Sequence, residues 1–299
     1  MPDRGGRGPR AVRLRGGRPP ALDGPVVLAA FAGWNDAGEA ATGALAEVRR
    51  RSGATPFADI DPEDFLDFQS VRPTVRFDED GGRRIDWPPN RFSRARLDGS
   101  DRHVVLLEGT EPNYRWRAFT EGIIGFVRDL GAELVVTLGA LQVDVPHTRA
   151  VPVTGSSSSP DVAARLGLRR STYEGPTGIV GVLHQACLSA RVPAVSLWAG
   201  VPHYLAGGPY HAGALALGER IVGLVGADIA LDGLARRAAA QRDEIGELVA
   251  DDEDLTAYVA ELERRFDAAP EGGPPDSQVS GEQLAAEFQR YLRDRGTER

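Results

Sequence analysis

Val26–Phe31 reads VVLAAF, an uninterrupted apolar run of the length of a strand. It is followed by Ala32–Asp36 (AGWND), which has the glycine and asparagine of a turn, and then by the alanine-rich residues 37–51. An apolar run, a turn and a helix in this order form one βα unit, whose strand lies inside a parallel sheet with both faces covered. The stretch therefore predicts an α/β fold.

The alternation of apolar runs and helical periodicity continues to about residue 225, as expected if several βα units build one mostly parallel sheet. Further strands are predicted over His103–Leu107, Glu133–Leu138, Val151–Thr154 and Pro193–Trp198, and further helices over residues 116–130, 178–190 and 210–225. Between them, the turn signal Asp80-Gly81-Gly82 predicts a β-hairpin insertion that joins residues 74–77 to 83–87. Residues 155–160 (GSSSSP) predict a polar loop.

The two ends of the chain differ from this α/β core, which we place at residues 23–226. Residues 1–22 are rich in Arg, Gly and Pro and predict a disordered leader. Residues 227–268 predict an acidic helical appendage with an apolar stripe along one side. A Pro/Gly linker at 269–279 and a short helix at 280–299 follow.

The composition excludes several classes of function. All 35 basic residues are arginine, so mechanisms that need a lysine, such as a P-loop or a Schiff base, are ruled out. The net charge of −8 argues against a nucleic-acid partner. A single cysteine, Cys187, allows neither an internal disulfide nor a Cys-rich zinc site. No apolar run is long enough to span a membrane, and we expect a cytoplasmic protein.

Candidate functional residues lie in the loops that follow the predicted strands, because ligands of open α/β sheets bind at the carboxyl ends of the strands. Four such loops are expected to meet at one rim and form one pocket for a ligand or partner. The candidate binding residues are Gly33, Trp34, Asp36, Glu111, Asp144, His147, Arg149, His203 and Tyr204.

The tripeptide Val-Pro-His occurs twice in these loops, at 145–147 and 201–203. His147 and His203 could face one cleft and act with Glu111 as an acid/base pair, or with a carboxylate as a metal site. The alternative is that both histidines hydrogen-bond the loop backbone. The ligand spacing is not compact, so we expect no metal. We also expect no cofactor and no catalytic residue.

Other polar groups of the rim also have structural interpretations. Asp36 and Glu111 each precede a predicted helix and are expected to cap it. Arg149 could bind an anion, pair with Asp144 or contact another subunit. Cys187 lies among apolar residues and is expected to be buried and inert.

Five separated motifs together resemble the bacterial branch of the proteasome assembly chaperone 2 family. They are FAGWNDAGEAA at 31–41, EGTEP at 108–112, DVPHTR at 144–149, YEGPTG at 173–178 and VPHY at 201–204. The resemblance implies a three-layer α/β/α sandwich similar to the phosphorylase/hydrolase-like architecture. It also implies a homo-oligomer, with a trimer as the first expectation, and a helical C-terminal extension. It assigns no catalytic residue to these positions.

Eukaryotic and archaeal members of that family help to assemble the proteasome α-ring and dock through a C-terminal hydrophobic-Tyr-X motif. This sequence ends Gly-Thr-Glu-Arg at 296–299, and Tyr291 lies eight residues before its end, so the motif is not expected here. The leading hypothesis is a non-enzymatic oligomeric binding protein whose rim binds a protein segment or a small ligand.

Two alternatives remain open. One is a phosphorylase- or hydrolase-type enzyme acting on a nucleoside-like or carboxylate substrate, with His147 or His203 as its acid/base group. The other is a structural oligomer in which Trp34 and Tyr204 anchor subunit contacts.

Overall fold

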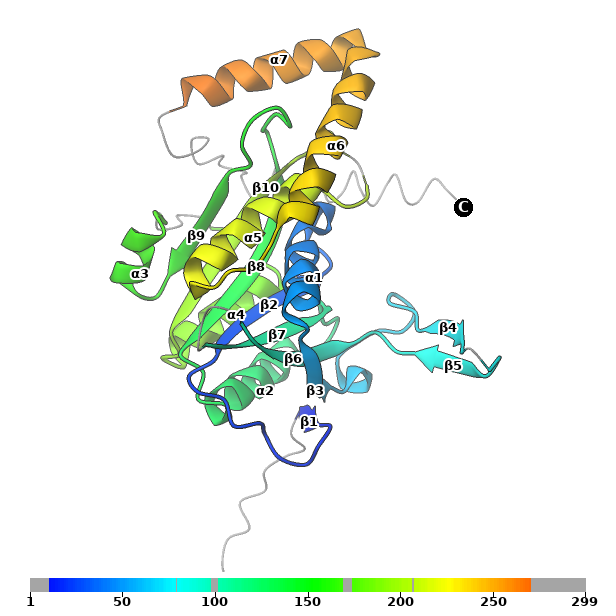
Figure 1. Ribbon diagram of the computed structural model, residues 1–299, viewed down its shortest axis with the longest axis vertical. Helices are drawn as coiled ribbons and strands as arrows, with labels where there is room; N and C mark the ends of the chain where they lie inside the picture. The colour runs from blue at the N-terminus through cyan, green and yellow to red at the C-terminus, as the bar shows by residue number, and fades with distance from the viewer. Residues whose placement is uncertain (1–10, 79, 98–101, 169–173, 206, 270–299) are drawn as a thin grey trace, which may run out of the picture.

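The computed structural model describes residues 11–78, 80–97, 102–168, 174–205 and 207–269. A central sheet of eight strands has helices on both sides (Figure 1). In spatial order its strands are β1 (Val12–Leu14), β3 (Thr55–Ile60), β6 (Asn90–Arg96), β7 (His103–Thr110), β2 (Val26–Ala32), β8 (Leu134–Val143), β10 (Ala194–Pro202) and β9 (Val153–Ser157). The predicted α/β class is confirmed.

The sheet is mixed, with a parallel centre. Strands β7, β2, β8 and β10 pair in parallel, as the βα units predict. The strands outside them pair antiparallel, β6, β3 and β1 on one side and β9 on the other. The carboxyl ends of the four central strands therefore share one edge of the sheet.

Alternate residues of β2 point to opposite faces of the sheet and belong to two separate cores. Val26, Leu28 and Ala30 pack with one set of helices, and Val27, Ala29 and Phe31 pack with another. The first set is α1 (Ala40–Ser52), α5 (His211–Val225) and α6 (Asp232–Ala250), and the second is α2 (Trp116–Asp129) and α4 (Ile179–Ser189). The three-layer α/β/α sandwich implied by the family resemblance is confirmed.

The remaining elements extend from this body. A separate two-stranded sheet, β4 (Thr74–Phe77) and β5 (Arg83–Asp86), is the predicted hairpin and projects from one side (Figure 1). α6 rises from the body and leads into α7 (Glu253–Ala268). Short helices are α3 (Pro160–Arg165) and the single turns η1 (Ala37–Glu39) and η2 (Pro62–Asp64). The predicted linker beyond Ala269 and the predicted helix at 280–299 lie outside the described residues.

Two predictions of irregular structure are wrong. Val12–Leu14, placed in the disordered leader, forms edge strand β1 against β3. Gly155–Ser157, placed in a polar loop, belongs to β9 at the other edge of the sheet. A Cβ atom at Gly155 would lie 2.1 Å from the carbonyl oxygen of Ser196, so this strand can approach β10 only through a glycine. An edge strand is half solvated, which explains why its sequence is polar.

Candidate functional site

The turn after β2 is organised around the side chain of Glu111. The Glu111 carboxylate accepts hydrogen bonds from the Trp34 amide at 3.3 Å and from the Asn35 side chain at 2.7 Å. It also accepts one from the amide of Ile179 at 2.8 Å, which is the first residue of α4. Gly33 has φ 139°, and a Cβ there would come within 3.0 Å of the Glu111 side chain, so the turn requires glycine.

Glu111 therefore caps a helix, although not the one predicted. α2 begins at Trp116, and the Glu111 carboxylate instead satisfies the N-terminus of α4, 68 residues further along the chain. Asp36 caps as expected: its Oδ1 accepts from the amides of Ala41 at 2.8 Å and Thr42 at 3.2 Å, in the first turn of α1. The Thr42 hydroxyl donates to the other oxygen. Burial raises the pKa of Asp36, against the opposing effect of these hydrogen bonds.

We call Gly33, Trp34, Asn35, Asp36 and Glu111 the turn cluster. Asn35, which the sequence analysis passed over, is almost fully buried and joins Glu111 to the turn. Trp34 lies on the outside, with 40% of its surface exposed. The polar groups of this cluster are used to shape the turn and to cap two helices.

The remaining predicted residues form a second group, which we call the docking cluster: Asp144, His147, Arg149, His203 and Tyr204. Its centre is the pair His147 and Tyr204. The Tyr204 hydroxyl accepts from the backbone amide of His147 and lies 2.7 Å from His147 Nδ1. Burial lowers the pKa of His147 and raises the pKa of Tyr204 to about 12. The Tyr204 hydroxyl therefore donates a hydrogen bond to Nδ1 of a neutral His147, and both side chains hold the loop in place.

His203 lies between the docking cluster and α7. Its Nδ1 is 3.1 Å from Asp144 Oδ1, and its Nε2 is 3.3 Å from the hydroxyl of Tyr258 on α7. The rings of His203, Tyr204 and Tyr258 meet edge to face, with centroids 5.5 to 6.2 Å apart. Such contacts add about 0.5–1.5 kcal/mol to the burial of each aromatic pair.

Arg149 makes the charged part of the same contact. It pairs with Glu263 at 3.1 Å and with Asp267 at 2.8 Å, both on α7, and Thr148 hydrogen-bonds Glu263. The hydrogen bond from Arg149 lowers the pKa of Asp267. Of the predicted alternatives, an ion pair is what forms, but its partners are on α7 and not Asp144. α7 thus packs on the surface formed by the docking cluster.

The nine residues predicted to share one pocket fall into two bonded groups, and the shared pocket stays a prediction. They divide between the turn cluster and the docking cluster, and among the described residues no hydrogen bond or ion pair joins the two. The division has a physical reason. α7 folds back onto the two loops that carry the docking cluster, whereas the two loops that carry the turn cluster face the N-termini of α1 and α4. In the described part of the chain, no group of three or more His, Cys, Asp or Glu side chains could hold a metal ion.

Most of this fold lies in a region of the chain that matches a known protein family. A family model described as the PAC2 family matches residues 30–249. The chain belongs to the PAC2 family. The match includes the turn cluster and the docking cluster but ends before α7, so the helix that covers the docking cluster lies outside the region shared with the PAC2 family model.

Two solved structures are close relatives of this PAC2 chain. A PAC2 family protein from Streptomyces avermitilis is 47% identical, with a TM-score of 0.74, over 79% of this chain and 99% of the other. A proteasome-assembly chaperone homologue from Mycobacterium tuberculosis is 45% identical, with a TM-score of 0.71, over 78% of this chain and 99% of the other. No curated protein matches the chain significantly.

The fold extends to more distant proteins. An archaeal proteasome activator from Pyrococcus furiosus is 15% identical, over 80% of this chain and 99% of the other, with a TM-score of 0.65. At this identity the likeness shows a common fold. No helix of the described residues is both long and apolar enough to cross a membrane.

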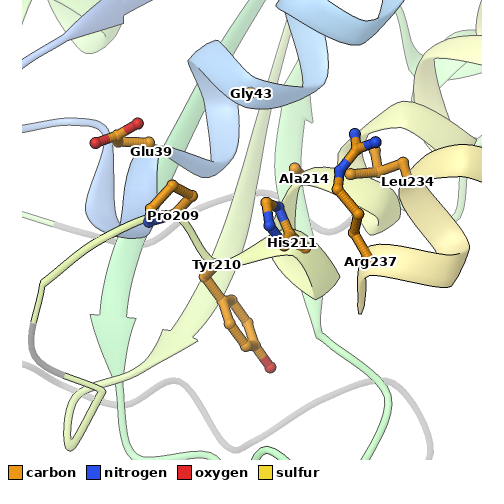
Figure 2. A pocket seen from close by; sticks show the side chains of 8 residues that line it. All are labelled: Glu39, Gly43, Pro209, Tyr210, His211, Ala214, Leu234 and Arg237. Carbon is orange, nitrogen blue, oxygen red and sulfur yellow. The ribbon is translucent and has the colours of Figure 1, made fainter. Parts of the chain in front are cut away.

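A pocket of about 200 Å³ was not predicted from the sequence of this PAC2 protein. Figure 2 shows its lining, which comes from η1, α1, α5, α6 and the loop before α5: Glu39, Gly43, Pro209, Tyr210, His211, Ala214, Leu234 and Arg237. None of the nine predicted residues is among them. No local motif signals this pocket, because helix packing brings its residues together.

Two further nucleophilic side chains lie away from both clusters. Cys187 is buried, as predicted, and burial raises the pKa of its thiol to about 12, so it is unreactive at neutral pH. Ser156 Oγ lies 3.3 Å from His184 Nε2, a pair that the sequence analysis missed. His184 Nδ1 has no hydrogen-bond partner among the described residues, so no third group orients this histidine as a catalytic base.

Proposed function

We propose that this protein is a non-enzymatic, chaperone-type binding protein whose docking cluster binds an acidic helical segment of a proteasome-related partner. One observation carries the proposal: the docking cluster already holds an acidic helix, α7, through Arg149, His203 and Tyr204. In the free protein α7 occupies the surface, and the partner segment replaces it.

The chemistry of the α7 contact supports replacement. The ion pairs of Arg149 are exposed to solvent, which screens the charges, so they add little to the stability of the contact. On α7 only Val259 and Leu262 are buried. A contact built from a few partly exposed polar groups and two buried apolar side chains is weak enough for a similar segment to compete with it.

The relatives support the class of partner. The Mycobacterium tuberculosis relative, at 45% identity, is described as a proteasome-assembly chaperone homologue. We propose the same class of partner, a proteasome-related protein, for this chain. We also propose that the chain assembles as a homo-oligomer, with a trimer as the first expectation.

The experiment measures binding of purified proteasome α-subunits to the full chain by isothermal titration calorimetry. In Tyr258→Ala/Glu263→Gln, α7 loses its hydrogen bond to His203 and one of its two ion pairs with Arg149, so competition falls and we expect binding about tenfold tighter. Tenfold corresponds to about 1.4 kcal/mol. Arg149→Glu places a negative charge against the acidic segment, and binding should be lost.

Arg265→Ala is the matched control, because Arg265 pairs with Glu261 on α7 itself. It should bind as the unchanged protein does. The proposal is overturned if no variant binds α-subunits, or if Arg149→Glu binds them as tightly as the unchanged chain.

The enzyme hypothesis is the second candidate, because Asp144 Oδ1 lies 3.1 Å from His203 Nδ1, although this nitrogen makes no hydrogen bond among the described residues. A screen of nucleoside, phosphate-ester and amide substrates tests it. Turnover that disappears in both His203→Ala and His147→Ala would favour the enzyme over the binding protein.

A further inference from the structure

The pocket between α1, α5 and α6 shares no residue with the turn cluster or the docking cluster. Its volume of about 200 Å³ lies below the range of about 300–1,000 Å³ that is typical of pockets for drug-sized molecules, so it admits only a small ligand. Its walls are mostly apolar: Gly43 comes from α1, Ala214 from α5 and Leu234 from α6. Gly43 keeps the space open, because a Cβ there would lie 3.5 Å from the Cβ of Ala214.

The two ends of the pocket carry opposite charges. Figure 2 shows Glu39 on one side, Arg237 on the other and His211 between them. Glu39 directly precedes α1, and Arg237 donates a hydrogen bond to Glu47, which lies eight residues further along the chain in that helix. At the helical rise per residue, the two ends are about 12 Å apart. A ligand that contacts both ends must therefore carry its charged groups at opposite ends.

The basic end of the pocket has more positive than negative charge. Three arginines pair with the buried carboxylate of Glu47: Arg50, Arg51 and Arg237. A Cβ at Gly233 would lie 3.0 to 3.8 Å from one guanidinium nitrogen of each arginine, so the three groups converge beside the start of α6. Even when the carboxylate of Asp232 is counted, the arginines outnumber the acidic groups. This end suits a carboxylate, which guanidinium groups bind through charge-assisted hydrogen bonds.

The acidic end is a single free carboxylate. The side chain of Glu39 is exposed, and no arginine pairs with it in the part of the chain that the structure describes. Its backbone has φ 47° and ψ 28°, a left-handed conformation that is uncommon for a residue other than glycine and that occurs preferentially at binding sites. A carboxylate without a partner at the end of a pocket suits an amino group.

His211 supplies a neutral polar group in the middle of the pocket. Burial and the nearby charge of Arg237 lower the pKa of His211, against the opposing effect of Glu244, so its imidazole is neutral at pH 7. Its backbone amide donates to Gln241 at 2.8 Å, but its ring makes no hydrogen bond with the described residues. A neutral imidazole has one donor and one acceptor, as a peptide group does. The middle of the pocket therefore suits an amide.

We propose that this pocket binds a dipeptide, with its amino group on Glu39, its peptide group on His211 and its carboxylate on Arg237. An extended chain of two residues spans about 7 Å, and a hydrogen bond of about 3 Å at each end makes up the remaining distance. A single amino acid is too short to reach both ends. The side chains of the dipeptide pack against Ala214 and Leu234, so small apolar residues are preferred. This inference goes beyond the proposed function, because the pocket contains no residue of the docking cluster and needs no proteasome-related partner.

The experiment measures the binding of alanylalanine to the full chain by isothermal titration calorimetry. We expect a dissociation constant below about 1 mM. N-acetyl-alanylalanine lacks the charged amino group and alanylalanine amide lacks the carboxylate, so each should bind about tenfold more weakly. 5-Aminopentanoate keeps both charged groups at a similar separation but lacks the peptide group, and it should also bind about tenfold more weakly.

Two variants assign the ends of the ligand. Glu39→Gln should bind alanylalanine about tenfold more weakly and leave the affinity for the N-acetyl form unchanged. Arg237→Gln should bind alanylalanine about tenfold more weakly and leave the affinity for the amide unchanged. Arg237 also pairs with Glu47, so circular dichroism checks that this variant is folded. Glu39 has no ion pair to lose among the described residues.

Glu121→Gln is the matched control, because it removes the same charge from α2, on the opposite face of the sheet. It should bind alanylalanine as the unchanged protein does. Three results would each overturn the proposal. Alanylalanine shows no binding at about 10 mM; a blocked form or 5-aminopentanoate binds as tightly as the free dipeptide; or Glu39→Gln binds as tightly as the unchanged chain. The last result does not depend on whether Arg237→Gln folds.

Discussion

At the scale of single residues, buried carboxylates hold this molecule together by capping helices or pairing with arginines. Asp36→Ala removes the acceptor for two amides of α1 and for the Thr42 hydroxyl. We expect the free energy of unfolding to fall by about 1–3 kcal/mol, the cost of leaving buried donors unpaired. Urea unfolding followed by circular dichroism measures it.

Asp36→Asn is the matched control, because it keeps an acceptor at the same place and should cost about 1 kcal/mol or less. Since burial raises the pKa of Asp36, folding favours its protonated form, and the stability it contributes falls as the pH rises above its ordinary value of 3.8. The asparagine variant cannot ionise and should lack this loss. Equal stability of the alanine and asparagine variants would contradict the capping role.

Glu47 gives the opposite pH dependence. It is 4% exposed, and although burial raises its pKa, hydrogen bonds from Arg51, Arg50 and Arg237 outweigh burial and lower it. Its stabilisation is therefore present above the ordinary pKa of 4.5 and is lost as the pH falls through the lower folded value.

Glu47→Gln should accordingly destabilise the protein by about 1–3 kcal/mol at pH 7, because the charged acceptor of three arginines is lost while the arginines, 31–53% exposed, stay solvated. The difference from the unchanged protein should narrow as the pH is lowered below about 4.5. Urea unfolding at a series of pH values measures both. A difference that stays constant down to pH 3 would rule out this linkage.

Sequence reasoning at this scale succeeds where a contact is local. Asp36 lies four residues before the start of the helix that it caps, so its role could be predicted. Glu111 acts on Ile179, and Arg149 acts on Glu263 and Asp267, and no spacing rule connects residues so far apart. The sequence identified Glu111 and Arg149 as candidate residues, but it did not identify the residues that they contact.

At the scale of elements, the strands with both faces buried were predictable, whereas of the sheet edges only the start of β9 was predicted. VVLAAF in β2 and the Asp80-Gly81-Gly82 turn of the β4–β5 hairpin each carry a strong local signal. β3 and β6 are flanked by proline and charged residues, and β9 consists of small polar residues, so their pairing depends on neighbouring strands rather than on their own periodicity.

The element whose stability we expect to respond separately is α7. Tyr258→Ala removes the ring contacts to His203 and Tyr204. Because α7 buries little else, we expect its amides to exchange with deuterium about tenfold faster while the amides of β2 and β8 keep their rates. Hydrogen exchange followed by mass spectrometry measures the exchange rates of α7 and of the two strands separately.

Arg265→Ala is again the control, because it changes a pair within α7. Its exchange rates at the docking-cluster loops should equal those of the unchanged protein. Uniformly faster exchange throughout the sheet in Tyr258→Ala would mean that α7 is part of the global folding unit and not a separately released helix.

At the scale of the whole molecule, the division of the rim into two clusters depends on how the C-terminal helices fold back. The apolar stripe of residues 255–266 predicts that this segment must be buried against something. It does not predict where, because any apolar surface of the body or of another copy would satisfy the pattern. The location of α7 is a property of the complete fold.

The two C-terminal helices have different places in that fold, and truncation separates them. Leu234, Ile245 and Val249 of α6 belong to the same core as α1 and α5, whereas α7 contributes one buried residue, Val259, to that core and otherwise lies on the docking cluster. Deletion of residues 228–299 uncovers the apolar surface between α1 and α5 and removes Arg237 from the buried Glu47. We expect that chain to aggregate.

Deletion of residues 252–299 leaves α6 in place and should give a soluble protein, since it exposes chiefly the polar docking cluster. The soluble fraction after expression, with light scattering of what remains, compares the two truncations. If both were equally soluble and of equal mass, α6 would not be closing the core. If both aggregated, α7 would have to cover far more apolar surface than Val259 and Leu262 provide.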